Sequence, residues 1–161
     1  MNTLSIAIVA LIIIIVALGI FQNRRSVAGG IHRDREEALS PCPTSSNCVS
    51  TYLGSGYASL KPMQYEGIDR DTAREILQSV LRSWPRCEIV TVEDDYMHAV
   101  MWSRIFRFRD DLEFHLPDSE SVVNFRAASR VGHDDFGIHR RRMHHITTTF
   151  EEAARKKSAG E

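Results

Sequence analysis

The sequence predicts an α+β fold, in which an antiparallel sheet of about four strands is covered by helices and preceded by one transmembrane helix. Three observations support this prediction. An uncharged apolar run covers Leu4–Phe21, a helical apolar stripe covers residues 69–84, and strand-like runs fill residues 87–130. Because only short connections separate the strand-like runs, neighbouring strands are expected to be antiparallel.

Composition limits the class of protein. The chain has 161 residues, 43% of them hydrophobic, yet its mean hydropathy is only −0.23 because the strongest apolar run is confined to the amino terminus. Its 20 basic and 21 acidic residues give a net charge of −1, which excludes a strongly basic nucleic-acid-binding protein. Three cysteines are too few for a disulfide-based scaffold. These values fit a single domain with an apolar appendage.

Residues 1–22 are predicted to form a transmembrane anchor. As a helix, the apolar run within them would span about 27 Å, close to the hydrocarbon thickness of a bilayer. A cleaved signal peptide is the alternative, but no basic residue precedes the run and two arginines separate it from the nearest small-residue site. Residues 23–39 are polar and predict a linker between anchor and domain.

The side of the membrane on which the domain lies depends on two opposing observations. The arginines at positions 24, 25, 33 and 35 all follow the apolar run, and the positive-inside rule then favours a cytoplasmic domain. Cys42 and Cys48 are close enough in sequence to form a small disulfide ring, which would indicate an oxidising compartment instead. Two reduced cysteines are the alternative. We expect the cytoplasmic side, with the extracytoplasmic side as the alternative.

A single α+β domain is predicted over residues 40–157. Its first helix begins near Asp69, contains the capping-box pattern Thr72-x-x-Glu75 and ends before Pro85. The apolar stripe of this helix consists of Ala73, Ile76, Leu77, Val80, Leu81 and Trp84. This is the most regular periodicity in the domain.

Several runs in the middle of the domain have strand character. They are Cys87–Val92, Tyr96–Ser103, Ile105–Phe108, Leu112–Leu116 and Ser121–Arg130. A terminal helix is expected over residues 139–157, with His139 on a solvated basic face and a disordered tail at 158–161. The inner stripe of that helix is predicted to be Met143, Ile146, Phe150 and Ala153.

Three segments resemble the motifs of a known family. Cys42–Thr51, with the pattern C-P-x-x-x-N-C-V-S-T, looks like the opening motif, Phe106–Phe114 like the middle motif and Arg126–Arg142 like the closing motif. Together they resemble the domain-of-unknown-function family numbered 1499, over nearly all of the domain. The resemblance implies no activity, substrate or catalytic residue, because the family has none established. His139 departs from the pattern, in which an asparagine is expected before the arginines.

The closing motif is rich in arginine and supplies the candidate site. Alternation along a strand places Asn124, Arg126 and Arg130 on one face, where Arg107 from a neighbouring strand can line the same groove. Planar guanidinium groups suit phosphate or carboxylate ligands. The candidate ligand-binding residues are therefore Arg107, Asn124, Arg126, Arg130, Asp135 and Arg140.

A structural network is the alternative interpretation of these arginines. In that case Arg126, Arg130 and Arg140 pair with nearby carboxylates instead of with a ligand. The near balance of acidic and basic residues in this part of the chain fits such a network. The available carboxylates are Asp110, Asp111, Glu113 and Asp135.

The sequence predicts a non-catalytic domain beside the membrane that binds an anionic small molecule, a lipid headgroup or a protein partner. The alternative is a small hydrolase-type enzyme that uses Asp110 or Asp111 with His98 or His133. No motif places a nucleophile next to these groups. No histidine spacing matches a recognised metal site, so neither a metal nor another cofactor is expected.

Overall fold

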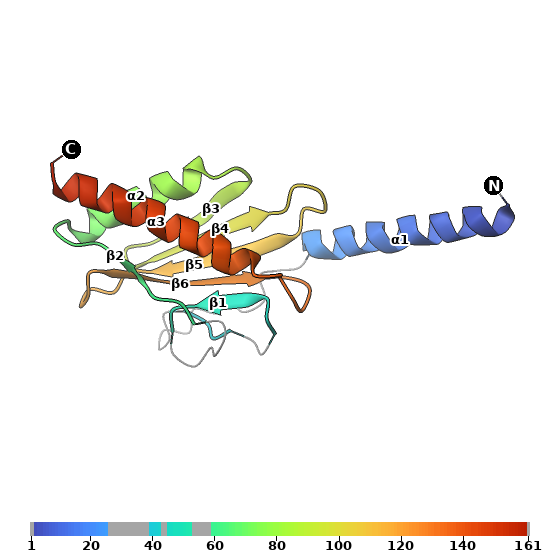
Figure 1. Ribbon diagram of the computed structural model, residues 1–161, viewed down its shortest axis with the longest axis horizontal. Coiled ribbons are helices and arrows are strands. Elements are labelled where there is room, and N and C mark those ends of the chain that lie inside the picture. The colour runs from blue at the N-terminus through green and yellow to red at the C-terminus, as the bar shows by residue number, and fades with distance from the viewer. Residues whose placement is uncertain (1, 26–38, 43–44, 53–58, 161) are drawn as a thin grey trace.

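The computed structural model describes residues 2–25, 39–42, 45–52 and 59–160. Its helices and strands follow in the order α1 (Thr3–Arg25), β1 (Cys48–Ser50), β2 (Met63–Gln64), α2 (Arg70–Ser83), β3 (Cys87–Val92), β4 (Tyr96–Trp102), β5 (Arg109–His115), β6 (Val122–Ser129) and α3 (Ile138–Ser158). Figure 1 shows α2 and α3 packed on one side of the sheet and α1 extending away from one end of the domain.

The sheet is antiparallel, as predicted. The strand order is β1-β6-β5-β4-β3, and β2 also pairs with β6. The predicted number of about four strands is wrong, because the described part of the chain forms a sheet of six. The two additional strands, β1 and β2, are only three and two residues long, which is too short to show an alternation in the sequence.

Residues 105–108, predicted as a short strand, instead belong to the loop between β4 and β5. Two hydrogen bonds close this loop: Ser103 N donates to Phe108 O (2.9 Å) and Phe108 N donates to Ser103 Oγ (3.0 Å). Arg107 has a φ of 55°, in the left-handed region that a strand does not use. The alternating pattern therefore marks a hairpin loop with exposed apolar side chains.

The two predicted helices of the domain are confirmed, with changes at their ends. Asp69 is the N-cap of α2, because its carboxylate accepts a hydrogen bond from Thr72 N (2.6 Å); the predicted capping box at Thr72 is wrong. α3 ends one residue beyond the predicted boundary. Its inner stripe includes Ala154 instead of Ala153, since position 154 lies four residues after the preceding buried side chain.

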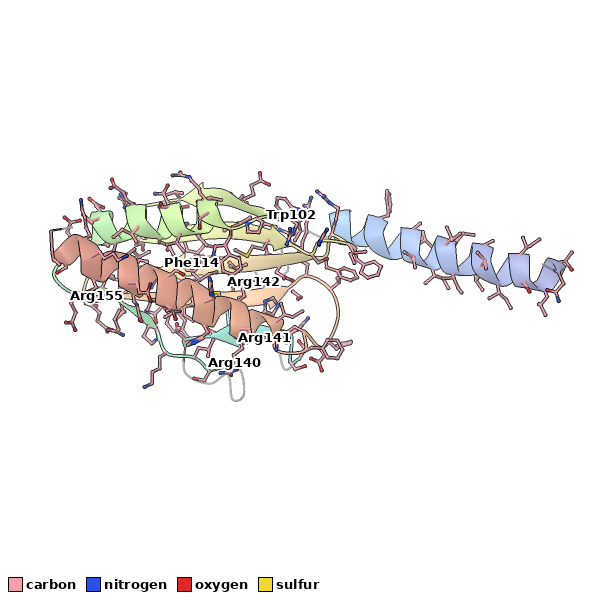
Figure 2. The ribbon with its side chains drawn as sticks, turned by 45° about the horizontal axis from the view of Figure 1, so that its top comes forward. Trp102, Phe114, Arg140, Arg141, Arg142 and Arg155 are labelled. Atoms are coloured by element: carbon pink, nitrogen blue, oxygen red, sulfur yellow. A yellow bond between two sulfur atoms is a disulfide. The ribbon has the colours of Figure 1, made fainter. Side chains whose placement is uncertain are left out.

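The hydrophobic core lies between the sheet and the helices α2 and α3. Met97, Ala99 and Met101 of β4 face it, as their alternation predicts. Phe114 of β5 lies at the middle of this layer, between sheet and helices (Figure 2). Other fully buried core residues are Leu77, Leu81, Leu112, Phe125, Ile146 and Phe150. The opposite face of the sheet carries neither α2 nor α3, and we call it the helix-free face.

α1 presents its apolar side chains to the outside. Leu4 is 66% exposed and Ile13 is 61% exposed. Among the described residues, no helix was found that is long and apolar enough to cross a membrane. α1 includes the first residues of the predicted linker, and residues 26–38 lie outside the described part of the chain. Figure 1 shows α1 leaving the domain at the end where the β4–β5 and β6–α3 loops lie, with the C-terminus at the opposite end.

Candidate functional site

Charged and polar side chains project from β4, β5 and β6 onto the helix-free face. His98, Asp111, Glu113 and Arg126 are each at most 6% exposed. They lie there because the neighbouring residues of each strand point into the core, and side chains alternate along a strand. Buried charges are tolerated only when they are paired, so the pairing of this group determines what it can do.

One pair consists of Arg126 and Glu113, which face each other across β6 and β5. Arg126 Nη1 donates to Glu113 Oε2 (2.7 Å), and Tyr96 OH donates to Glu113 Oε1 (3.0 Å). Both charged side chains are almost fully buried. Arg126 is therefore part of the scaffold, as the network alternative predicts.

The second group centres on Asp111. Arg130 makes two hydrogen bonds to this carboxylate, from Nε to Oδ2 and from Nη2 to Oδ1, each 2.8 Å long. His98 Nε2 lies 2.9 Å from Asp111 Oδ1. Burial alone raises the pKa of Asp111, but the hydrogen bonds from His98 and Arg130 and the charge of Arg130 bring it below its ordinary value. Asp111 is thus held as a carboxylate.

A cleft of about 630 Å³ opens beside this group on the helix-free face. It is lined by Glu88, Val90, His98, Val100, Trp102, Arg107, Arg109 and Arg130. Arg107 lies over the ring of Trp102, with its guanidinium carbon 5.7 Å from the ring centroid, within the range of a cation–π contact. Three arginines and one carboxylate, Glu88, line the cleft, so its described lining is net positive.

Asp110 precedes Asp111 on β5 and points to the opposite face, toward α3. Its Oδ1 accepts a hydrogen bond from Ser129 Oγ (2.8 Å), and its Oδ2 accepts one from Arg142 Nη1 (2.7 Å). Ser129 Oγ also lies 2.9 Å from His139 Nε2. This cluster joins β5, β6 and α3.

His139 is fully buried, so the prediction of a solvated histidine is wrong at this position. It lies four residues before Met143 and begins the inner stripe of α3. Burial lowers the pKa of His139 below 6.5, although the nearby carboxylate of Asp110 acts in the opposite direction. His139 is therefore held in its neutral form.

The cluster contains the residue types of a Ser-His-Asp triad but not its geometry. In a triad the carboxylate orients the histidine, which accepts the serine proton. Here the hydroxyl hydrogen of Ser129 goes to Asp110, so His139 Nε2 must donate to Ser129 Oγ. His139 Nδ1 is left without a hydrogen-bond partner among the described residues. The arrangement therefore cannot activate Ser129 as a nucleophile.

Arg140 and Arg141 lie in the first turn of α3, where the helix macrodipole is unfavourable for cations, and Arg142 follows directly. Asp135 offsets this, because its carboxylate accepts hydrogen bonds from Gly137 N (2.9 Å) and His139 N (2.6 Å). Arg142, which was not among the arginines expected to pair, forms an ion pair with Asp110 (2.7 Å). Asp135 therefore stabilises the start of α3.

The six predicted ligand-binding residues do not converge on one site. Arg107 and Arg130 line the cleft. Asn124 accepts a hydrogen bond from Thr51 Oγ1 (3.0 Å), at the other end of β6. Arg126 lies in the buried pair with Glu113. Asp135 and Arg140 lie at the start of α3.

Sequence reasoning missed Glu88, Trp102 and Arg109 as cleft residues. Alternation alone places Trp102 on the face of its strand that carries His98, and Arg109 on the face that carries Asp111. It places Glu88 on a face with Val90 and Val92. Their convergence depends on the register of three strands, in which Trp102 pairs with Arg109 and Glu88 pairs with Val100. That register was not readable from one sequence.

Cys42 and Cys48 form a disulfide, with their Cα atoms 5.7 Å apart. Of the two alternatives that the sequence left open, the structure has the bonded one. Cys87 is a free cysteine that packs, half-buried, against the core. Burial raises the pKa of its thiol to about 11.

Fold and site together define a small α+β domain whose antiparallel sheet carries buried ion pairs and a positively charged cleft on one face. The family model described as "Protein of unknown function (DUF1499)" matches residues 38–150. The chain belongs to this family, and the resemblance seen in its three motifs is confirmed. No curated protein and no solved structure matches the chain.

Proposed function

We propose that this chain is a non-catalytic binding domain, held at a membrane by α1, whose cleft on the helix-free face takes an anionic group. The observation that carries the proposal is the convergence of Arg107, Arg109 and Arg130 on one cleft. The described lining of that cleft includes one carboxylate, Glu88. A phosphate or carboxylate group, free or part of a lipid headgroup, has the matching charge and geometry.

Arg130 differs from Arg126 because it lines the cleft as well as pairing with a carboxylate. Its two hydrogen bonds to Asp111 fix the plane of the guanidinium before any ligand arrives. A cation that is already positioned loses little conformational entropy on binding. The ring of Trp102 is a contact for the guanidinium of Arg107, another arginine that lines the cleft.

The membrane attachment is supported by the sequence and exposure of α1. No charged residue occurs from Asn2 to Gln22, and the described apolar side chains of α1 are largely exposed. Burial of this surface in lipid would remove it from water, which is favourable by about 25 cal/mol per Å². The domain does not bury this apolar surface, because the described residues of α1 do not pack extensively against it.

The disulfide and the arginines that follow the apolar run of α1 favour opposite sides of the membrane for the domain. A Cys42–Cys48 bond persists in an oxidising compartment and is rare in the cytosol. We therefore propose the extracytoplasmic side for the domain, although the positive-inside rule alone favours the cytoplasm.

The proposal predicts that an anionic molecule co-purifies with the detergent-extracted full chain. Native mass spectrometry should find a bound phosphorylated or carboxylated species in the wild type. The Arg107→Gln/Arg109→Gln variant should lose it, because two of the three guanidiniums that line the cleft are removed. Arg82→Gln is the matched control, since Arg82 is an exposed arginine on α2. Equal retention in all three proteins would contradict the proposal.

The His98–Asp111 pair is the one observation that favours the hydrolase-type alternative. His98 lines the cleft, and Asp111 holds its ring at 2.9 Å, so His98 is oriented as a general base would be. No serine, threonine or cysteine is among the described lining residues, so the nucleophile would be water. A His98→Gln variant that keeps the bound anion but loses turnover of it would favour the enzyme.

A further inference from the structure

We propose that the end of the domain nearest α1 docks on an anionic bilayer surface and inserts a rim of apolar side chains into the headgroup region. This inference rests on the membrane attachment proposed above. The apolar rim consists of Ile105, Phe106 and Phe108 from the β4–β5 loop, Phe136 from the β6–α3 connection and Ile138, the first residue of α3.

The rim side chains are exposed to a degree that is unusual for residues of this kind. Phe136 is 81% exposed and Ile105 is 77% exposed, while the other three are between 41% and 46% exposed. Every exposed phenylalanine among the described residues of the domain lies in the rim. Single exposed apolar residues need no explanation, but a gathering of five indicates an interaction surface.

The two segments of the rim lie side by side. A cavity of about 490 Å³ is lined by Phe108 from one segment and by Phe136 and Ile138 from the other. Gly19, near the end of α1, lines the same cavity. Figure 1 shows both loops at the end from which α1 extends. If α1 enters a bilayer, the rim therefore faces the surface of that bilayer.

Hydrogen bonds fix the backbone conformation of both segments, so the rim is preorganised before it meets a bilayer. The Ser103–Phe108 hydrogen bonds close the first loop. In the second, Phe136 N donates to Asp134 Oδ1 (2.8 Å), and Phe136 has a left-handed φ of 53°. A large side chain rarely adopts this conformation, which persists where the surrounding structure imposes it.

The charges around the rim favour a lipid surface over an apolar protein partner. Arg104 and Arg141 are exposed beside it, and Arg141 Nη1 donates to Phe136 O (3.1 Å). Figure 2 shows Arg141 and Trp102 at this end and Arg155 at the other. The nearby carboxylates of Asp134 and Asp135 accept backbone hydrogen bonds within the β6–α3 connection. Phenylalanines flanked by arginines are the composition that binds the interface of anionic membranes.

The test places a tryptophan in the rim and measures its depth in a bilayer. The full chain is reconstituted into vesicles of phosphatidylcholine and phosphatidylglycerol, made with or without brominated acyl chains, which quench tryptophan fluorescence. Phe136→Trp and Phe106→Trp are compared with wild type, so that the native tryptophans are subtracted. Ser119→Trp is the matched control, because Ser119 lies in the exposed turn between β5 and β6, at the other end of the domain.

We expect the fluorescence added at positions 136 and 106 to be quenched at least twofold more than that added at position 119. Equal, weak quenching at all three positions in vesicles that carry the protein would overturn the docking while leaving the anchor intact. A chain that fails to float with the vesicles would instead overturn the membrane part of the proposed function, and the docking with it. The two failures are thus distinguished by flotation of the same samples.

Discussion

At the scale of single residues, two consecutive aspartates organise both faces of the sheet. Asp110 serves the core side, through Ser129 and Arg142, and Asp111 serves the helix-free face, through His98 and Arg130. The alternation of a strand explains why neighbours act in opposite layers. The sequence shows the residue types, but their partners lie 13 to 32 positions away and depend on the tertiary fold.

Asp111→Asn should destabilise the domain by about 3–5 kcal/mol at pH 7, because Arg130 would stay buried without its carboxylate. The pKa of Asp111 is lowered from 3.8, since the His98 and Arg130 contacts outweigh the effect of burial. Its stabilisation is therefore present above about pH 4 and is lost as the pH falls through the lower, folded-state value. Urea unfolding between pH 7 and pH 3 measures both effects.

The control for this prediction is Asp118→Asn. Asp118 pairs with Arg70 at the surface, where its side chain is 85% exposed. Loss of that pair should change the free energy of unfolding by at most about 1 kcal/mol. Similar losses in the two variants would contradict the structural role given to Asp111.

His139 should make the domain less stable as the solution becomes mildly acidic. Its pKa is lowered by burial, so below about pH 6.5 the unfolded chain binds a proton that the folded domain excludes. The free energy of unfolding should fall from pH 8 to pH 5 in the wild type and more shallowly in His139→Gln. His144→Gln, at an exposed position of α3, should keep the wild-type slope. Identical slopes in all three would show that His139 is accessible to protons.

At the scale of elements, the strength of a periodic pattern decided what could be predicted. The stripe of α2 and the alternation of β4 and β6 are long enough to define both the element and its inward face. β1 and β2 are too short to carry a pattern, and they form because β6 offers them an edge. The apolar alternation at residues 105–108 predicted a strand wrongly, because these residues belong to a loop whose apolar side chains face outward.

The inward face of α3 is tested by a pair of equal substitutions. Ala154 is 1% exposed and packs in the core, whereas its neighbour Ala153 is only partly buried. Ala154→Leu should cost about 1–3 kcal/mol through overpacking, and Ala153→Leu should stay within about 0.5 kcal/mol of wild type. Thermal unfolding of the two variants checks this. A larger loss of stability in Ala153→Leu than in Ala154→Leu would instead support the inner stripe with Ala153 that the sequence alone predicts.

At the scale of the whole molecule, the sequence predicted an arginine-rich site but not where it would form. Arg126 and Arg130 lie on one strand face as expected, yet one is buried against Glu113 and the other lines the cleft. The difference arises from β4 and β3, which bring Trp102 and Glu88 only to the end of the sheet near Arg130. Such convergence is a property of the strand register.

The compartment proposed for the domain can be tested through its cysteines. Denatured, unreduced protein from cells should accept a thiol label at Cys87 alone, because Cys42 and Cys48 are bonded. Native protein should label slowly at Cys87 near pH 8, since burial raises the pKa of that thiol to about 11. Labelling of all three cysteines before reduction would place the domain in a reducing compartment.

The central claim is that the cleft on the helix-free face binds an anion, and calorimetric titration of the detergent-solubilised full chain with inorganic phosphate tests it most directly. We predict saturable binding at one site per chain. Arg109→Gln should weaken it roughly tenfold or more, the effect of losing one charge-assisted hydrogen bond. Arg82→Gln should bind like wild type. Absence of binding, or the same affinity in all three proteins, would contradict the claim.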